Sequence, residues 1–261
     1  MRRVASALAL VALIGGCRER APSIPGAGLL DARLPDGSTW VPSSSGRGGS
    51  TTRPRIPSGC HARILVIFDR SGSMGGEWSD TGEQKWRVAA TALASAIEPL
   101  ADHLTVGAIL FPSLTPGADG CWPVDPIEAS LPFTSGASML AAWEGMTDPL
   151  EIGGSTPIDT AFARADEALD DGDGTPTAVV LLTDGQPTCS ERPSAIERAA
   201  AWHARGISTH VVGLPGAHGT ETLDAIARAG GTDAALSVDE PAALTDRLSR
   251  IATETSEQGC R

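Results

Sequence analysis

Basic residues are scarce in this sequence, and they do not cluster. The chain has 20 lysines and arginines against 32 acidic residues, a formal net charge of -12, and Lys85 is its only lysine. Binding to nucleic acid needs a patch of basic side chains, and so does electrostatic binding to an anionic bilayer. We therefore expect no nucleic acid among the partners. The excess of carboxylates favours solubility and the attraction of cations.

Motifs of common enzyme classes are also lacking. The histidines show no metalloprotease spacing, Gly72–Gly75 does not match the Gly-x-Ser-x-Gly motif of serine hydrolases, and residues 213–219 lack the dinucleotide-binding fingerprint. A phosphatase of the haloacid dehalogenase type would use Asp69 as its nucleophile and needs a second aspartate where this chain has Ser71. We therefore predict a protein that is not an enzyme and has no small-molecule substrate, with a Mg²⁺-dependent phosphatase as a distant alternative.

Long apolar runs are absent apart from one at the N-terminus. Val4–Ile14 is too short to span a bilayer, and it lies between the basic pair Arg2 and Arg3 and the small residues before Cys17. This order is typical of a secretory signal peptide. We therefore predict that residues 1–16 are a signal and that the protein is exported.

The end of this signal, Leu13-Ile14-Gly15-Gly16-Cys17, resembles the lipobox of bacterial lipoproteins. The resemblance implies cleavage before Cys17 and lipidation of its sulfur, whereas the alternative is an ordinary signal peptide followed by an incidental cysteine. Several acyl chains on one residue hold a protein firmly, while a single chain binds only marginally. We expect a protein that is lipid-anchored in the bacterial cell envelope, at the outer membrane or the cell surface.

Composition divides the remaining chain into two parts. Residues 17–59 are rich in proline, glycine and serine and too poor in clustered apolar residues to form a core, which predicts a flexible tether. Leu29, Leu30, Leu34 and Trp40 are exceptions, either a short segment that docks on the domain or an exposed patch. Residues 60–261 alternate apolar runs with amphipathic patterns, and about 200 residues can bury an adequate core.

The pattern in residues 60–261 predicts an α/β fold with a mostly parallel sheet covered by helices on both faces. Ile64–Phe68 is continuously apolar, as expected for a central parallel strand, while Ile127–Phe133 is flanked by prolines, which suits an edge strand. Further strands are predicted over 105–111, 177–183, 207–214 and 234–238, and helices over 83–100, 138–146, from Pro157, and over 191–205, 221–229 and 241–255.

Oxygen-bearing side chains follow the first predicted strand. Asp69, Ser71 and Ser73 form an Asp-x-Ser-x-Ser motif, Thr156 lies in a Gly-Gly-Ser-Thr-Pro loop, and Asp184 follows the strand that ends at residue 183. Carboxylate and hydroxyl oxygens are the ligands that Mg²⁺ and Mn²⁺ prefer. In open α/β sheets, ligands bind at the carboxyl ends of the strands. The sequence therefore predicts a metal site at this edge.

These residues, taken in order, are similar to the three-part metal-ion-dependent adhesion site of von Willebrand factor type A (vWA) domains. The resemblance implies a doubly wound sheet in the order 3-2-1-4-5-6 with the third strand antiparallel at one edge. It also implies that Ser71 and Ser73 ligate the cation directly, and that Asp69, Thr156 and Asp184 do so directly or through water. The expected cofactor is Mg²⁺, or Mn²⁺ or Ca²⁺, and the expected partner is a protein that presents an Asp or Glu carboxylate.

Each motif also has a purely structural explanation. Asp-x-Ser-x-Ser favours local turns, and Ser155 or Thr156 can cap the following helix. The alternative to an adhesion site is therefore a structural vWA module with no functional metal site. We expect Thr183 and Ser155 to orient the ligands, and Trp78 to lie either at the rim of the site or in a solvated loop.

Four cysteines remain once Cys17 is assigned to lipid, and they allow three pairings. Cys60 precedes the first strand and Cys260 follows the last helix, so both are expected at the bottom of the sheet. Cys121 and Cys189 follow other strands and are expected at the top, near the metal site. We predict the disulfides Cys60–Cys260 and Cys121–Cys189, with free buried thiols as the alternative.

Overall fold

The computed structural model describes residues 59–79, 81–117, 121–170, 174–190 and 192–260. The predicted signal peptide, Cys17 and the predicted tether up to residue 58 lie outside the described residues. Within the described part of the chain, no helix is both long and apolar enough to cross a membrane.

Among the described residues, six strands form one sheet in the order β3-β2-β1-β4-β5-β6, as predicted. Of the pairings between these six strands, only that of β2 with β3 is antiparallel, which confirms the expected edge strand. The two central strands, β1 and β4, are buried along their whole length, as their continuous apolar runs indicate. The strands are β1 (Ala62–Asp69), β2 (Leu104–Phe111), β3 (Leu131–Ser135), β4 (Thr177–Thr183), β5 (Ser208–Gly213) and β6 (Leu236–Ser237).

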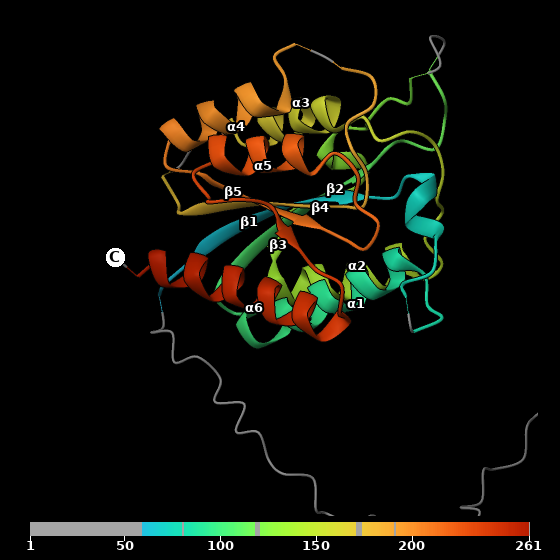
Figure 1. Ribbon diagram of the computed structural model, residues 1–261. Coiled ribbons are helices and arrows are strands. Elements are labelled where there is room, and N and C mark those ends of the chain that lie inside the picture. Colours follow the sequence, from blue (N-terminus) through green and yellow to red (C-terminus); the bar gives the residue numbers. More distant parts are fainter. Residues whose placement is uncertain (1–58, 80, 118–120, 171–173, 191, 261) are drawn as a thin grey trace, which may run out of the picture. The chain divides into compact units, whose positions relative to one another are not determined.

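Helices cover both faces of the sheet (Figure 1). One layer contains α1 (Lys85–Ile97), α2 (Gly136–Thr147) and α6 (Pro241–Gln258), and the other contains α3 (Ile158–Ala168), α4 (Ala195–Ala204) and α5 (Thr220–Ala229). Successive side chains of β1 point to opposite faces, so Val66 and Phe68 join the core under α1 while Leu65 and Ile67 join the other. The short 3₁₀ turns are η1 (Gly72–Gly75), η2 (Glu98–Leu100) and η3 (Ile127–Ala129).

Several predicted boundaries are wrong, mostly next to proline. The segment predicted as a strand from Ile127 begins with η3, because Pro126 caps a tight turn, and β3 starts only at Leu131. Helix α4 begins at Ala195 instead of residue 191, because Ser194 and Glu197 form a capping box there. The final strand is shorter than predicted, and α6 extends to Gln258.

Both predicted disulfides are present. Cys60–Cys260 joins the chain before β1 to the end of α6, with 4.7 Å between the Cα atoms. Cys121–Cys189 joins the loop after β2 to the loop after β4, with Cα atoms 6.0 Å apart. The first therefore closes the domain at the amino ends of the strands, and the second links two loops at the carboxyl ends.

Candidate metal centre

The carboxyl end of the sheet brings the predicted ligands of β1 and β4 together. Asp69 is the last residue of β1, and Asp184 directly follows β4, the strand that pairs with β1. Ser71 precedes η1 and Ser73 lies within it, so the Asp-x-Ser-x-Ser motif curls over the strand end. In Figure 1 this edge is on the right, where η1 lies beyond the sheet.

Asp69 is completely buried and accepts hydrogen bonds on both oxygens. The Ser71 amide donates to Oδ1 at 2.7 Å, and the Thr183 hydroxyl donates to Oδ2 at 2.5 Å. The first bond is the local turn bond that the structural explanation of the motif predicts. The second joins residues far apart in the sequence, so Thr183 orients Asp69 as expected.

The second carboxylate, Asp184, bridges the serine motif and helix α1. The Ser73 hydroxyl donates to Oδ1 of Asp184 at 2.7 Å, and the hydroxyl oxygens of Ser71 and Ser73 are 3.2 Å apart. The ammonium of Lys85 donates to the other oxygen, Oδ2, also at 2.7 Å. Two loops separated by more than a hundred residues of chain are thus joined through one side chain.

Thr156 lies beside these groups in the loop between α2 and α3. Its amide donates to the Thr188 hydroxyl at 2.8 Å, and a Cβ atom placed on Gly185 would lie 3.2 Å from the Thr156 hydroxyl oxygen. The Gly72 amide donates to the Gly154 carbonyl at 3.3 Å, which ties this loop to η1. The structure therefore brings all five predicted ligands to one edge of the sheet.

The alternative role as a helix cap is not found. The residue that caps α3 is Pro157, and no side chain caps this helix. The Ser155 hydroxyl instead accepts a long hydrogen bond, 3.4 Å, from the Trp122 amide, so the expectation that Ser155 orients a ligand is not supported by its contacts.

Burial raises the pKa of Asp69 to about 7, with a smaller contribution from the negative charge of Asp184, while hydrogen bonds from Thr183 and Ser71 oppose the rise. A cation beside Asp69 would reverse this effect, because it favours the charged form. The donor set of two carboxylates and three hydroxyls consists of hard oxygen ligands, which fits a divalent cation such as Mg²⁺. No group of three or more His, Cys, Asp or Glu side chains positioned to hold a metal occurs among the described residues.

Aromatic residues around the site differ from the prediction. Trp78 is fully buried and donates its indole N–H to the Asp239 carbonyl at 2.8 Å, so it lies neither at the rim nor in a solvated loop. Trp122 instead packs on the site loop, because a Cβ on Gly154 would come within 2.4 Å of its ring. Gly154 also has φ +83°, so glycine is required there on two grounds.

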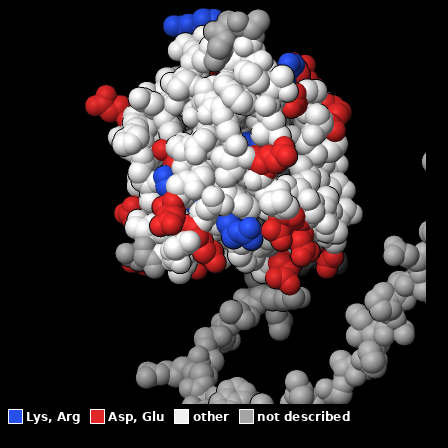
Figure 2. Space-filling view, turned by 90° about the vertical axis from the view of Figure 1, so that its right-hand side faces the viewer, with Lys and Arg blue, Asp and Glu red and all other residues white. Residues whose placement is uncertain are grey.

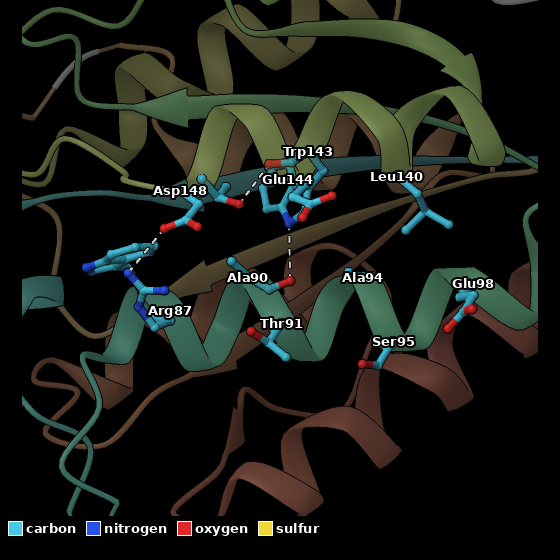
Figure 3. A pocket seen from close by; sticks show the side chains of 12 residues that line it. Arg87, Ala90, Thr91, Ala94, Ser95, Glu98, Leu140, Trp143, Glu144 and Asp148 are labelled. Atoms are coloured by element: carbon cyan, nitrogen blue, oxygen red, sulfur yellow. Dashed lines mark hydrogen bonds and ion pairs between the residues drawn. The ribbon is translucent and has the colours of Figure 1, made fainter. Parts of the chain in front are cut away.

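The face at the carboxyl end of the sheet exposes more acidic than basic side chains (Figure 2). A separate cavity of about 450 Å³ lies between α1 and α2, and none of the five predicted ligands lines it. Figure 3 shows the Trp143 indole of that cavity donating to the Ala90 carbonyl at 3.1 Å, and the ion pair of Arg87 with Asp148 at 3.4 Å. The cavity is thus a groove between two helices, apart from the candidate metal centre.

Solved structures resemble this fold at low sequence identity. A pilus adhesin, SpaC from Lactobacillus rhamnosus GG, aligns with a TM-score of 0.58 and 17% identity over 76% of this chain and 31% of the adhesin. Proximal thread matrix protein 1 from the mussel byssus, with a zinc-occupied MIDAS motif, has a TM-score of 0.57 and 15% identity over 77% of this chain and 47% of that protein. A von Willebrand factor type A structure from Catenulispora acidiphila has a TM-score of 0.59 and 19% identity over 75% and 43% of the two chains.

At these identities the likeness shows the fold, and this chain spans less than half of each of the three proteins. No curated protein matches the sequence. The von Willebrand factor type A domain family, in contrast, matches residues 64–250, from the first strand to the last helix. The chain therefore belongs to the von Willebrand factor type A domain family.

Proposed function

We propose that residues 60–261 form a protein-binding domain of the adhesion type that depends on a divalent cation. When bound, the cation supplies an electrophilic position that accepts an Asp or Glu carboxylate of a partner protein. Mg²⁺ is the expected ion, with Mn²⁺ or Ca²⁺ as substitutes. The residues proposed to hold it are Asp69, Ser71, Ser73, Thr156 and Asp184.

The convergence of these five residues from three loops supports the proposal most strongly. Two carboxylates balance the charge of a divalent ion, and the neutral hydroxyls complete its coordination without adding negative charge. The ion therefore stays electrophilic enough to take a further carboxylate. Asp69 supports the same conclusion, because its burial makes its negative charge costly unless a positive charge lies beside it.

We also propose that the domain is exported and held in the bacterial cell envelope by a lipid on Cys17, with residues 18–59 as the tether. The two disulfides favour an oxidising compartment, since such bonds rarely persist in a reducing cytosol. One structural neighbour is a pilus adhesin, which is in keeping with a role in attachment at a surface.

A structural module without a functional metal site is the second candidate, and one contact favours it. The ammonium of Lys85 already pairs with Asp184, so part of the charge that a cation would neutralise is neutralised by the chain itself. A phosphatase is less consistent with the sequence. A phosphatase of the haloacid dehalogenase type needs a second aspartate two residues after its nucleophile, and this chain has Ser71 there.

Cation-dependent thermal stability tests the proposal. A cation that binds only the native state stabilises it by about 2.7 kcal/mol at a hundred times its Kd, which raises the melting temperature of a domain of this size by about 5–10 °C. We expect this rise when millimolar Mg²⁺ or Mn²⁺ is added to the chelator-treated protein. An unchanged melting temperature with both ions would rule out the metal site.

Two double variants test whether Mg²⁺ acts at the proposed site or at other carboxylates of the protein. The double variant Asp69→Ala with Asp184→Ala should lose the response to Mg²⁺. Asp148→Ala with Glu167→Ala removes two exposed, ion-paired carboxylates and should keep it. Equal responses in both double variants would place the cation elsewhere.

The partner and the phosphatase alternative need separate assays. A pull-down from native envelopes should recover the partner with Mg²⁺ and lose it with chelator. An identical catch in both conditions would assign binding to another face. The protein should not hydrolyse an aryl phosphate in the presence of Mg²⁺. Turnover that Asp69→Asn abolishes would establish the phosphatase instead.

A further inference from the structure

Lys85, the only lysine of the chain, is tied to the candidate metal centre but is not one of its proposed ligands. It is the first residue of α1, and its Nζ atom lies 2.7 Å from Oδ2 of Asp184. The side chains of Lys85 and Asp184 are 14% and 1% exposed, so this ion pair is largely shielded from solvent.

The ammonium of Lys85 also approaches two other loops. Its Nζ atom would lie 3.4 Å from a Cβ on Gly216, in the loop between β5 and α5, and 3.8 Å from one on Gly76, in the loop before α1. Both distances correspond to ordinary van der Waals contact, so the ammonium lies close to the backbone of both loops. The ammonium of Lys85 therefore lies among the loops that follow β1, β4 and β5 at the carboxyl ends of these strands.

The two oxygens of Asp184 have different partners. Oδ1 accepts from the hydroxyl of Ser73, a proposed ligand, whereas Oδ2 accepts from Lys85. The lysine thus occupies the oxygen that Asp184 would need in order to bind a cation with both oxygens. It also fixes the direction in which Oδ1 points.

The charge of Lys85 changes the electrostatic balance of the site. With a cation beside them, Asp69 and Asp184 both carry a negative charge, and the positive charge of Lys85 leaves these three side chains with a single net negative charge. A divalent cation then leaves the loaded centre with a net positive charge instead of a neutral one. Cation binding is weakened, while attraction for a negatively charged partner group is strengthened.

We infer that Lys85 is a positioning residue that takes over part of the cation's role. It neutralises and holds Asp184 when no cation is bound, lowers the affinity for the cation, and gives the loaded centre its positive charge. This inference rests on the proposed function, because it concerns the affinity of the same centre.

Lys85→Met tests the inference, because methionine keeps the unbranched apolar stem and removes the charge. Its metal-free melting temperature should fall, since Asp184 is left buried without its cationic partner. Its Kd for Mg²⁺, measured by calorimetry, should fall by about tenfold, because a like charge next to the ion is removed.

Three further variants make the comparison specific. Lys85→Arg keeps the charge and should bind Mg²⁺ with an affinity close to that of the wild type. Arg87→Met removes a cation two residues further along α1 whose ion pair is exposed, and it should change neither quantity. Lys85→Gln can still donate a hydrogen bond to Asp184. Lys85→Gln therefore provides a folded neutral variant if Lys85→Met unfolds without Mg²⁺. We expect Lys85→Gln also to bind Mg²⁺ more tightly than the wild type does.

The outcomes distinguish this inference from the proposed function. Mg²⁺ binding to the wild type, with equal or weaker binding to Lys85→Met and Lys85→Gln, would overturn the role of Lys85 and leave the metal site intact. Absence of Mg²⁺ binding from the wild type and from every Lys85 variant would overturn both. Binding to the neutral variants alone would support the effect of Lys85 on cation affinity and overturn the proposed function, because the lysine would then keep the cation out of the native site.

Discussion

Asp69→Asn is predicted to stabilise the cation-free protein at alkaline pH. Burial raises the pKa of Asp69 from 3.8 to about 7. Because the native state holds this proton more tightly than the unfolded chain does, the contribution of Asp69 to native stability is greatest below about pH 4 and is lost as pH rises through about 7. The difference between the two pKa values corresponds to about 4 kcal/mol above that range. Asparagine is neutral throughout and avoids this cost.

The surroundings of Asp69 can accept an amide. The Ser71 amide, which donates to Oδ1, can donate equally to the asparagine carbonyl oxygen. The Thr183 hydroxyl, which donates to Oδ2, can instead accept from the asparagine NH₂ group, because a hydroxyl both donates and accepts. The substitution therefore removes the charge while leaving both polar neighbours with a partner.

Urea unfolding of chelator-treated protein across the pH range measures the effect. The difference in unfolding free energy between Asp69→Asn and the wild type should be small near about pH 4 and grow to about 4 kcal/mol by about pH 8. The control Asp148→Asn changes an exposed carboxylate and should show no such trend. A difference that does not vary with pH would refute the assignment of the cost to the buried charge. Added Mg²⁺ should stabilise the wild type and leave Asp69→Asn unchanged.

Three other predictions concern the disulfides and a partly buried histidine. Replacing both Cys60 and Cys260 by serine should lower the free energy of unfolding by about 5 kcal/mol, because this disulfide closes a loop of 200 residues. Urea unfolding without reductant measures the loss. Removing Cys121–Cys189, which closes 68 residues, should cost about 4 kcal/mol and, unlike the first, should also weaken Mg²⁺ binding, measured by calorimetry. Burial lowers the pKa of His210, so the unfolded chain takes up a proton that the native state resists, and stability falls as pH drops below about 6.5. His210→Gln should lessen this fall in acid unfolding curves.

The elements predicted best from sequence are those that the core determines. β1 and β4 each contain a continuous apolar run because helices cover both of their faces, and this pattern predicts both ends of β4, Thr177–Thr183, correctly. The start of β3 was missed because the apolar residue Ile127 is buried in a 3₁₀ turn as well as it would be in a strand. Burial of an apolar side chain alone therefore does not distinguish a 3₁₀ turn from a strand.

The candidate site was predictable as a set of ligands but not as a set of contacts. Asp69 and Asp184 follow strands, so their meeting at one edge follows from topology. The contacts of Lys85 and Trp78 depend on groups 99 and 161 residues away, and no local pattern indicates them. The position of Trp78 after the motif predicts a place near the surface, but its indole N–H donates to the Asp239 carbonyl, in the segment before α6.

Contacts within the chain already hold the three site loops together. Thr156 and Thr188 exchange two hydrogen bonds, the hydroxyl of Ser73 reaches Asp184, and η1 is bonded to the loop before α3. A cation entering such a site has little backbone to order, so most of its binding free energy depends on local charge and desolvation. The charge of one enclosed lysine is then a strong determinant of affinity. Changing that charge should alter cation binding more than changing any loop residue that is not a proposed ligand and leaves these hydrogen bonds intact.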